Sequence, residues 1–131
     1  MKHILVVEDE PDIQELLCAC LRDAGYQVSE ALDGVEALAL FQSRPFDLVL
    51  LDVMLPKIDG FGVCEVIRRQ SQIPVLMLTA LEGEEDQLRG FGMDIDDYVT
   101  KPFSMPVLLE KIRVILRRSS GKDEENCLCY R

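Results

Sequence analysis

The chain has 131 residues, a length at which one domain is the natural count, and a formal net charge of −10. A domain of this size buries roughly two-thirds of the surface that its unfolded chain exposes, so a full core forms without disulfide staples. Because so large a negative charge repels phosphate backbones, we expect any contact with DNA to need another domain. The first apolar run, residues 4–7, is too short for a signal peptide and no membrane-length segment follows, so we expect a cytoplasmic protein without a membrane partner.

The five cysteines are odd in number and irregularly spaced, which argues against a disulfide framework. Cys20 and Cys64 fall at apolar helical positions, and we expect both to pack in the core. Cys18 lies two residues from Cys20 and is expected to point off that face. The roles of Cys127 and Cys129, in a polar tail, stay open, since the spacings typical of structural zinc are absent.

Short apolar segments alternate with helical patterns along the chain, at residues 4–7, 27–31, 47–51, 75–79 and 97–100. Such alternation predicts an α/β protein whose parallel sheet has right-handed crossovers. The aliphatic run at 48–51 indicates a strand covered on both faces, and it ends at Asp52. Ligands bind outside the carboxyl ends of such strands, so Asp52 is a candidate site residue; the alternative is that it only caps a turn.

The helical segments carry recognisable start and stop signals. The first begins near Pro11 and stops at Gly25. Its expected buried positions are Ile13, Leu16, Leu17, Cys20 and Ala24. The second follows Asp33-Gly34 and the third follows Asp59-Gly60. Their expected buried positions are Leu38 and Phe41 in the second, and Val63, Cys64 and Ile67 in the third.

The last two helical segments differ in the strength of their signals. A fourth helix, about 84–92, has acidic residues at its beginning and a glycine within it. The fifth begins at Ser104, a good cap, and ends at Arg117-Arg118. Its expected buried positions are Leu108, Ile112, Ile115 and Leu116. We therefore expect one domain at 1–118, followed at 119–131 by a linker or the start of a C-terminal effector domain that is absent from this chain.

Polar residues follow the apolar strands at one predicted edge of the sheet. They are Glu8, Asp9, Asp52, Thr79 and Lys101. Three carboxylates at one point repel one another unless a cation lies between them, and oxygen ligands with room for water suit Mg²⁺. Taken singly, an acidic pair after a strand is more often a solvated loop.

Residues 2–118 resemble the receiver domain of a two-component response regulator, in the winged-helix OmpR/PhoB-type subgroup. The matching motifs are ILVVEDE at 4–10, LLDVMLP at 50–56, Asp59-Gly60, PVLMLTA at 74–80 and DDYVTKPF at 96–103. The resemblance implies a flavodoxin-like doubly wound (βα)5 fold with a five-stranded parallel sheet in the order 2-1-3-4-5. It also implies a phosphoacceptor switch that assists its own phosphorylation and dephosphorylation, and not an enzyme.

The resemblance also assigns the site residues. It implies that Asp52 accepts the phosphoryl group from a sensor histidine kinase. It implies that Glu8, Asp9 and Asp52 hold Mg²⁺ together with the backbone carbonyl of Met54. By the same resemblance Lys101 contacts the phosphoryl group.

Switching and pairing are implied by the same family. Thr79 and Tyr98 form the switch, although Tyr98 could be an ordinary strand aromatic. Phosphorylation is expected to repack the face made by helix four, strand five and helix five, and to drive homodimerisation through it. The dimer-face residues are Asp96, Asp97, Lys111 and Arg113; a solvated surface of mixed charge is the alternative reading. Asp94, where the subgroup usually has glycine, leaves the dimer geometry open.

Two other functions fit the architecture less well. A phosphatase with an aspartate nucleophile needs an acid two residues after Asp52, where this chain has Met54. A flavin-binding module needs a phosphate cradle after the first strand, where the acidic residues 8–10 repel phosphate. Within the receiver interpretation, we expect control of transcription through a C-terminal DNA-binding domain, the alternative being a stand-alone receiver that acts through protein contacts.

Overall fold

The computed structural model describes residues 2–53, 55, 57–79, 97–100 and 103–128, with side chains for all of these except 79, 97 and 119–128. Its strands are β1 (His3–Val7), β2 (Gln27–Ala31), β3 (Leu48–Asp52), β4 (Val75–Thr79) and β5 (Asp97–Thr100). Its helices are α1 (Pro11–Asp23), α2 (Gly34–Ser43), α3 (Gly60–Gln70) and α5 (Met105–Leu128). All strand pairs are parallel and the order is β2-β1-β3-β4-β5, which confirms the expected fold class. The helix expected at 84–92 lies outside the described residues.

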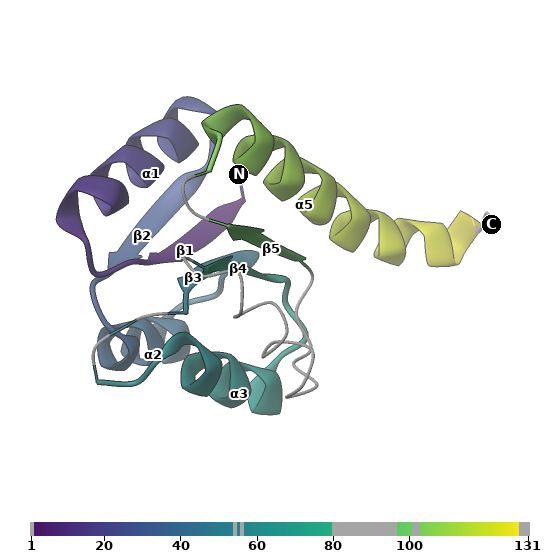
Figure 1. Ribbon diagram of the computed structural model, residues 1–131. Coiled ribbons are helices and arrows are strands. Elements are labelled where there is room, and N and C mark those ends of the chain that lie inside the picture. The colour runs from purple at the N-terminus through teal and green to yellow at the C-terminus, as the bar shows by residue number, and fades with distance from the viewer. Residues whose placement is uncertain (1, 54, 56, 80–96, 101–102, 129–131) are drawn as a thin grey trace.

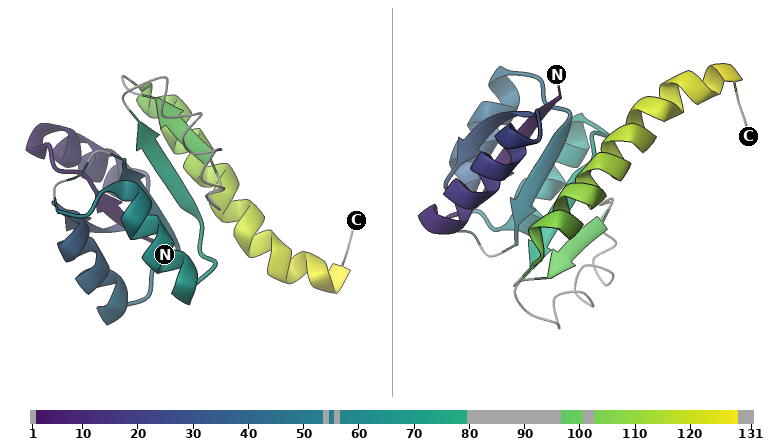
Figure 2. Two further views of the ribbon diagram at one scale, coloured as in Figure 1. Left: turned by 60° about the horizontal axis from the view of Figure 1, so that its bottom comes forward. Right: turned by 90° about the horizontal axis from the view of Figure 1, so that it is seen from above.

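Helices cover both faces of the sheet. Helices α1 and α5 lie on one face, and α2 and α3 lie on the other (Figures 1 and 2). Successive side chains along a strand therefore enter different cores: Leu48 and Leu50 join the cluster under α1 and α5, whereas Val49 and Leu51 join the cluster over α2 and α3. The whole of β3 is buried, as the aliphatic run predicts for a strand covered on both faces.

The buried face of α1 differs from the expected one. Its buried residues are Gln14, Leu17, Cys18 and Leu21. The expectation for the two cysteines was wrong, since Cys18 is 1% exposed and Cys20 is only partly buried. Leu16 and Ala24 were also misplaced, because Leu16 is 53% exposed and Ala24, the residue that follows the helix, is exposed as well. The observed set follows the i, i+3, i+4, i+7 spacing of one helical face, and it was missed because one of its members is polar.

Helices α2 and α3 begin as the sequence predicts, each with an aspartate cap. The Asp33 carboxylate accepts a hydrogen bond from the Glu36 N–H at 2.8 Å, and Asp59 accepts one from the Gly62 N–H at 2.9 Å. The predicted core positions of α3 are fully buried, and those of α2 pack partly buried against the same cluster. The caps thus fix where both helices start beside the carboxyl ends of the strands.

Helix α5 buries the four residues expected of it, with exposed fractions from 0% to 5%. Its expected end at Arg118 was wrong, because the helix continues to Leu128. The added turns project away from the sheet (Figures 1 and 2). The boundary between a domain at 1–118 and a following segment stays a prediction.

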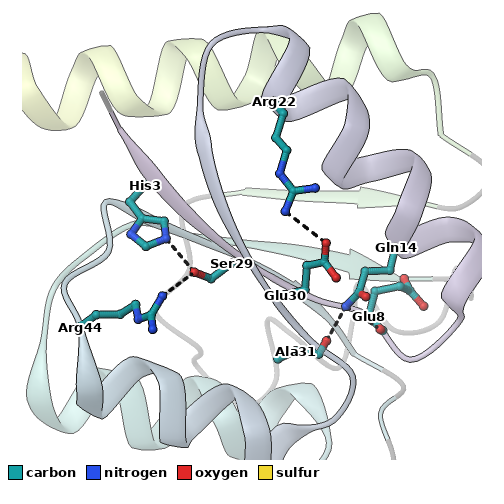
Figure 3. Close-up of polar contacts among 8 residues, drawn as sticks. All are labelled: His3, Glu8, Gln14, Arg22, Ser29, Glu30, Ala31 and Arg44. Atoms are coloured by element: carbon teal, nitrogen blue, oxygen red, sulfur yellow. Dashed lines mark hydrogen bonds and ion pairs between the residues drawn. The ribbon is translucent and has the colours of Figure 1, made fainter.

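His3 lies at the end of the sheet where the strands begin, away from their carboxyl ends. The ring Nε2 of His3 lies 2.8 Å from the hydroxyl of Ser29, and that hydroxyl also accepts a hydrogen bond from Arg44 at 3.4 Å (Figure 3). The backbone N–H of His3 donates to the Asp47 carboxylate at 2.8 Å. Burial and the nearby Arg44 guanidinium lower the pKa of His3, although Asp47 and the carbonyl of Pro45 act in the opposite direction. The neutral ring is therefore the form that the folded chain favours.

Candidate functional site

Three carboxylates meet at the carboxyl ends of β1 and β3. Glu8 and Asp9 directly follow β1, and Asp52 is the last residue of the neighbouring strand. One carboxylate oxygen from each residue lies within 4.8 Å of the others. Glu8 is 0% exposed and Asp52 is 2% exposed, whereas Asp9 is exposed to solvent. The sequence-based prediction that these side chains converge is confirmed.

This arrangement suits a divalent cation. Carboxylates packed this closely repel one another, and a cation among them removes the repulsion. The oxygen donors are all hard ligands, and the open side at Asp9 leaves room for water, as Mg²⁺ requires. The residues present therefore fit Mg²⁺, which Glu8, Asp9 and Asp52 would hold.

Backbone hydrogen bonds hold Glu8 against β2. Its N–H donates to the carbonyl of Ala31 at 3.1 Å. One carboxylate oxygen accepts a hydrogen bond from the Glu10 N–H at 3.1 Å. Hydrogen bonds to Ala31 of β2 and to Glu10 thus hold this buried carboxylate in its direction.

The loop from β3 to α3 packs tightly beside Asp52. The Gly60 N–H donates to the carbonyl of Val53 at 2.9 Å, which brings the start of α3 back onto the end of β3. A methyl group added at Gly60 would lie 2.4 Å from the backbone oxygen of Asp52, so only glycine fits here without a shift. Lys57 adopts a left-handed φ of 71°, and its ammonium pairs with Asp33 at 3.3 Å. This ion pair connects the loop to the cap of α2.

The remaining predicted site residues are placed to different degrees. Thr79 ends β4 at the same sheet edge, one residue beyond the partner of Asp52 in the register. Tyr98, on β5, is partly buried against the core cluster of α2 and α3. Met54 and Lys101 lie outside the described residues.

The predicted dimer face is partly described. Lys111 and Tyr98 line one pocket of about 360 Å³ between β5 and α5, together with Val99, Thr100, Phe103, Ser104 and Val107. Arg113 instead forms an ion pair with Glu110 of its own helix, and the arginine lowers the pKa of Glu110 through this hydrogen bond. Asp97 begins β5, and Asp96 lies outside the described residues. A role of these residues in pairing stays a prediction.

Sequence reasoning missed two polar features near the acidic site. Gln14 is buried in α1, and its amide reaches the carboxyl ends of β1 and β2. The periodicity of α1 gives the signal, since Gln14 stands i−3 and i−4 from the buried Leu17 and Cys18. The pairing of Lys57 with Asp33 has no comparable signal, because it depends on how two loops fold against each other.

Comparison with known proteins assigns the family. The sequence model of the family described as the response regulator receiver domain matches residues 4–113. The chain belongs to this family. Among curated proteins, this receiver domain is 50% identical over 116 residues to the probable transcriptional regulator ycf27 of Cyanidium caldarium, covering 88% of the chain and 47% of that protein. It is 46% identical over 122 residues to the DNA-binding dual master transcriptional regulator RpaA of Synechocystis sp., covering 91% of the chain and 51% of that protein.

The chain thus spans about half the length of the curated relatives that it matches. These transcriptional regulators confirm the resemblance to the OmpR/PhoB-type subgroup.

Solved structures agree on the fold. A crystal structure of the response regulator TrrA from Thermotoga maritima, in complex with Mg(2+)-BeF, is 40% identical with a TM-score of 0.80, covering 88% of this receiver domain and 99% of that chain. The receiver domain of Francisella response regulator 1452 is 31% identical with a TM-score of 0.84, covering 91% and 99%.

None of the helices in the described part of the chain combines the length and the apolar character needed to cross a membrane.

Proposed function

We propose that this receiver domain is a phosphorylation switch in which Asp52 accepts a phosphoryl group from a sensor histidine kinase with the help of Mg²⁺. The observation that carries the proposal is the convergence of Glu8, Asp9 and Asp52 within 4.8 Å at the carboxyl edge of the sheet. Family membership supports it. The Mg(2+)-BeF complex of TrrA supports the choice of metal.

The chemistry is a transfer between two covalent partners. A carboxylate oxygen of Asp52 forms the new P–O bond while the bond from phosphorus to the donor's histidine nitrogen breaks, and the phosphoryl group passes in line between them. Bound Mg²⁺ supplies positive charge that offsets the charge on the phosphoryl oxygens. Burial of Asp52 in the last position of β3 fixes the attacking oxygen in one place, which is the main contribution that a protein makes to this reaction. By resemblance, Lys101 contacts the phosphoryl group as a second positive charge.

The domain acts as a switch and not as an enzyme in this proposal. The new phosphoryl oxygens on Asp52 accept a hydrogen bond from Thr79, and Tyr98 fills the space that Thr79 leaves. Tyr98 packs against the core cluster of α2 and α3, so its ring can move only if the neighbouring side chains rearrange. Phosphorylation then changes the face around β5 and α5, through which two copies pair using Asp96, Asp97, Lys111 and Arg113.

Control of transcription completes the proposal. The curated relatives are named as transcriptional regulators and are about twice as long as this chain. We infer that DNA binding belongs to an effector domain outside this chain, that residues 119–131 lead toward it, and that the protein works in the cytoplasm. The alternative, a stand-alone receiver, shares the phosphorylation step and differs only in its output.

Intact mass spectrometry tests the phosphorylation step. The purified chain is incubated with a small-molecule phosphodonor, with and without Mg²⁺, beside Asp52→Asn and the control Asp23→Asn, which changes an exposed carboxylate at the end of α1. We expect the parent and Asp23→Asn to gain the mass of one phosphoryl group, only with Mg²⁺, and Asp52→Asn to gain none. Equal phosphorylation of Asp52→Asn, or no gain by the parent with Mg²⁺ present, would overturn the proposal.

A further inference from the structure

Gln14 is unusual among the described side chains because it is polar and buried. The buried polar or charged residues in this part of the chain are Glu8, Gln14 and Asp52, and Gln14 is only 5% exposed. Two of the three belong to the acidic site. Burying an amide is unfavourable unless its hydrogen bonds are made, so the contacts of Gln14 indicate what it does.

Both contacts of the Gln14 amide concern the backbone around Glu8. Its Nε2 donates to the carbonyl of Ala31 at 2.7 Å (Figure 3) and to the carbonyl of Glu8 at 3.3 Å. The Glu8 N–H donates to the same Ala31 carbonyl at 3.1 Å. These three bonds close a ring in which the N–H and the carbonyl of Glu8 are both held, one by β2 and the other by α1.

Fixing both backbone groups of Glu8 fixes the direction of its side chain. The bond from Cα to Cβ follows from the orientation of the two flanking peptide groups, and the carboxylate is then held by the Glu10 N–H. A residue that only anchored α1 to the sheet could bond to any strand carbonyl. The carbonyls that Gln14 selects are those that define the position of Glu8.

We propose that Gln14 is a positioning residue for the Mg²⁺ site, which aims the Glu8 carboxylate at the point shared with Asp9 and Asp52. This inference rests on the proposed function, since it assumes that the acidic site holds Mg²⁺. Loss of a residue that orients a metal ligand typically weakens metal binding by about 10–100-fold. Gln14→Met keeps the length of the side chain and removes both N–H donors, so it is expected to raise the Mg²⁺ dissociation constant by at least about tenfold.

The matched control is Gln42→Met, the same replacement at an exposed position of α2, where the amide donates to the side-chain oxygen of Gln70 at 2.8 Å. Mg²⁺ affinity is measured by calorimetric titration of each folded chain. The rise in melting temperature caused by Mg²⁺ is measured in parallel, because a ligand stabilises the fold according to its affinity whatever the stability of the metal-free protein. We expect weaker binding and a smaller Mg²⁺-induced rise for Gln14→Met, and parent values for Gln42→Met.

A purely structural role predicts a different result. In that case Gln14→Met lowers the melting temperature with and without Mg²⁺ by the same amount and leaves the dissociation constant unchanged, which overturns the inference. If Gln14→Met does not fold, Gln14→Asn serves instead, since it keeps a polar group in the site but is one methylene too short to reach both carbonyls. Unchanged Mg²⁺ binding by Gln14→Asn would likewise overturn it.

Failure of the proposed function gives its own pattern. A parent chain that binds Mg²⁺ but gains no phosphoryl group refutes the phosphorylation step, and the dissociation constants of the Gln14 variants still decide the positioning role. A parent that gains the phosphoryl group, with Gln14 variants that bind Mg²⁺ as tightly as it does, refutes only the positioning role. A parent that binds no Mg²⁺ refutes both.

Discussion

Replacing Gly60 by alanine places one methyl group between the start of α3 and the end of β3. The added carbon would lie 2.4 Å from the backbone oxygen of Asp52 and 2.8 Å from the Cα of Val53. No side-chain rotation relieves a contact with backbone atoms, so the strand or the helix has to move. The position that moves is the one that carries the proposed phosphoacceptor.

The expected magnitude follows from two opposing effects. Alanine is favoured over glycine by up to about 1 kcal/mol inside a helix, and by less at the first helical position, which Gly60 occupies. Overpacking a tight site typically costs about 1–3 kcal/mol. We therefore expect Gly60→Ala to lower the free energy of unfolding by about 1–2 kcal/mol, a fall of roughly 3–8 °C in melting temperature for a chain of this length.

Gly62→Ala is the matched control, two residues further along the same helix. Its added methyl group would meet only side-chain atoms among its nearest neighbours, the Cγ2 of Ile58 at 2.8 Å and the Asp59 carboxylate at 3.6 Å. Because a side-chain atom can shift without moving the strand or the helix, we expect Gly62→Ala to lower the free energy of unfolding by less than Gly60→Ala does. Urea unfolding followed by circular dichroism gives the stabilities, and intact mass gives the rate of phosphorylation. Equal stability and equal phosphorylation of Gly60→Ala and the parent, or an equal loss in Gly62→Ala, would refute this reasoning.

Two further predictions follow from the ionisable groups. Because burial and Arg44 hold the pKa of His3 below its ordinary value of 6.5, its contribution to the free energy of unfolding is fully present above pH 6.5 and is lost as the pH falls through the lowered pKa. Urea unfolding from neutral to acid pH should show a shallower loss for His3→Gln than for the parent, and identical slopes would contradict this. Burial, with a smaller contribution from Glu30, raises the pKa of the Cys18 thiol to about 12, so iodoacetamide at mildly alkaline pH should alkylate Cys20 well before Cys18. Peptide mapping by mass spectrometry measures both rates, and equal rates would show that Cys18 is not held as a buried thiol.

The sheet and the acidic site were predictable because their signals are local and strong. The run at 48–51 is apolar at every position, which is typical of a strand covered on both faces, and β3 ends at Asp52 one residue later. Parallel strands end at the same edge, so the acidic residues after β1 and at the end of β3 had to lie close together.

The details that sequence reasoning missed depend on packing or on weak preferences. Counting only apolar residues hides the face of α1 that Gln14 shares with Leu17, Cys18 and Leu21. Which carbonyls its amide reaches depends on how α1 lies against the strands. The Ser-Ser-Gly segment at 119–121 suggests a helix end, but one glycine costs only about 1 kcal/mol in a helix and each further residue adds a hydrogen bond. The continuation of α5 to Leu128 is consistent with that small cost.

The length of α5 allows a small movement of the helix to become a larger one at its end. Leu116 is the last core residue among the α5 side chains that the structure describes, and a further 12 positions carry the helix on to Leu128, a distance of roughly 18 Å at the usual rise per residue. A small tilt of α5 on the sheet therefore becomes a larger sideways movement at its far end, because a helix bends little over such a length. The same helix contributes Val107 and Lys111 to the pocket beside Tyr98. A change of packing around the Tyr98 ring that tilts α5 would therefore produce a larger displacement at the far end of the helix.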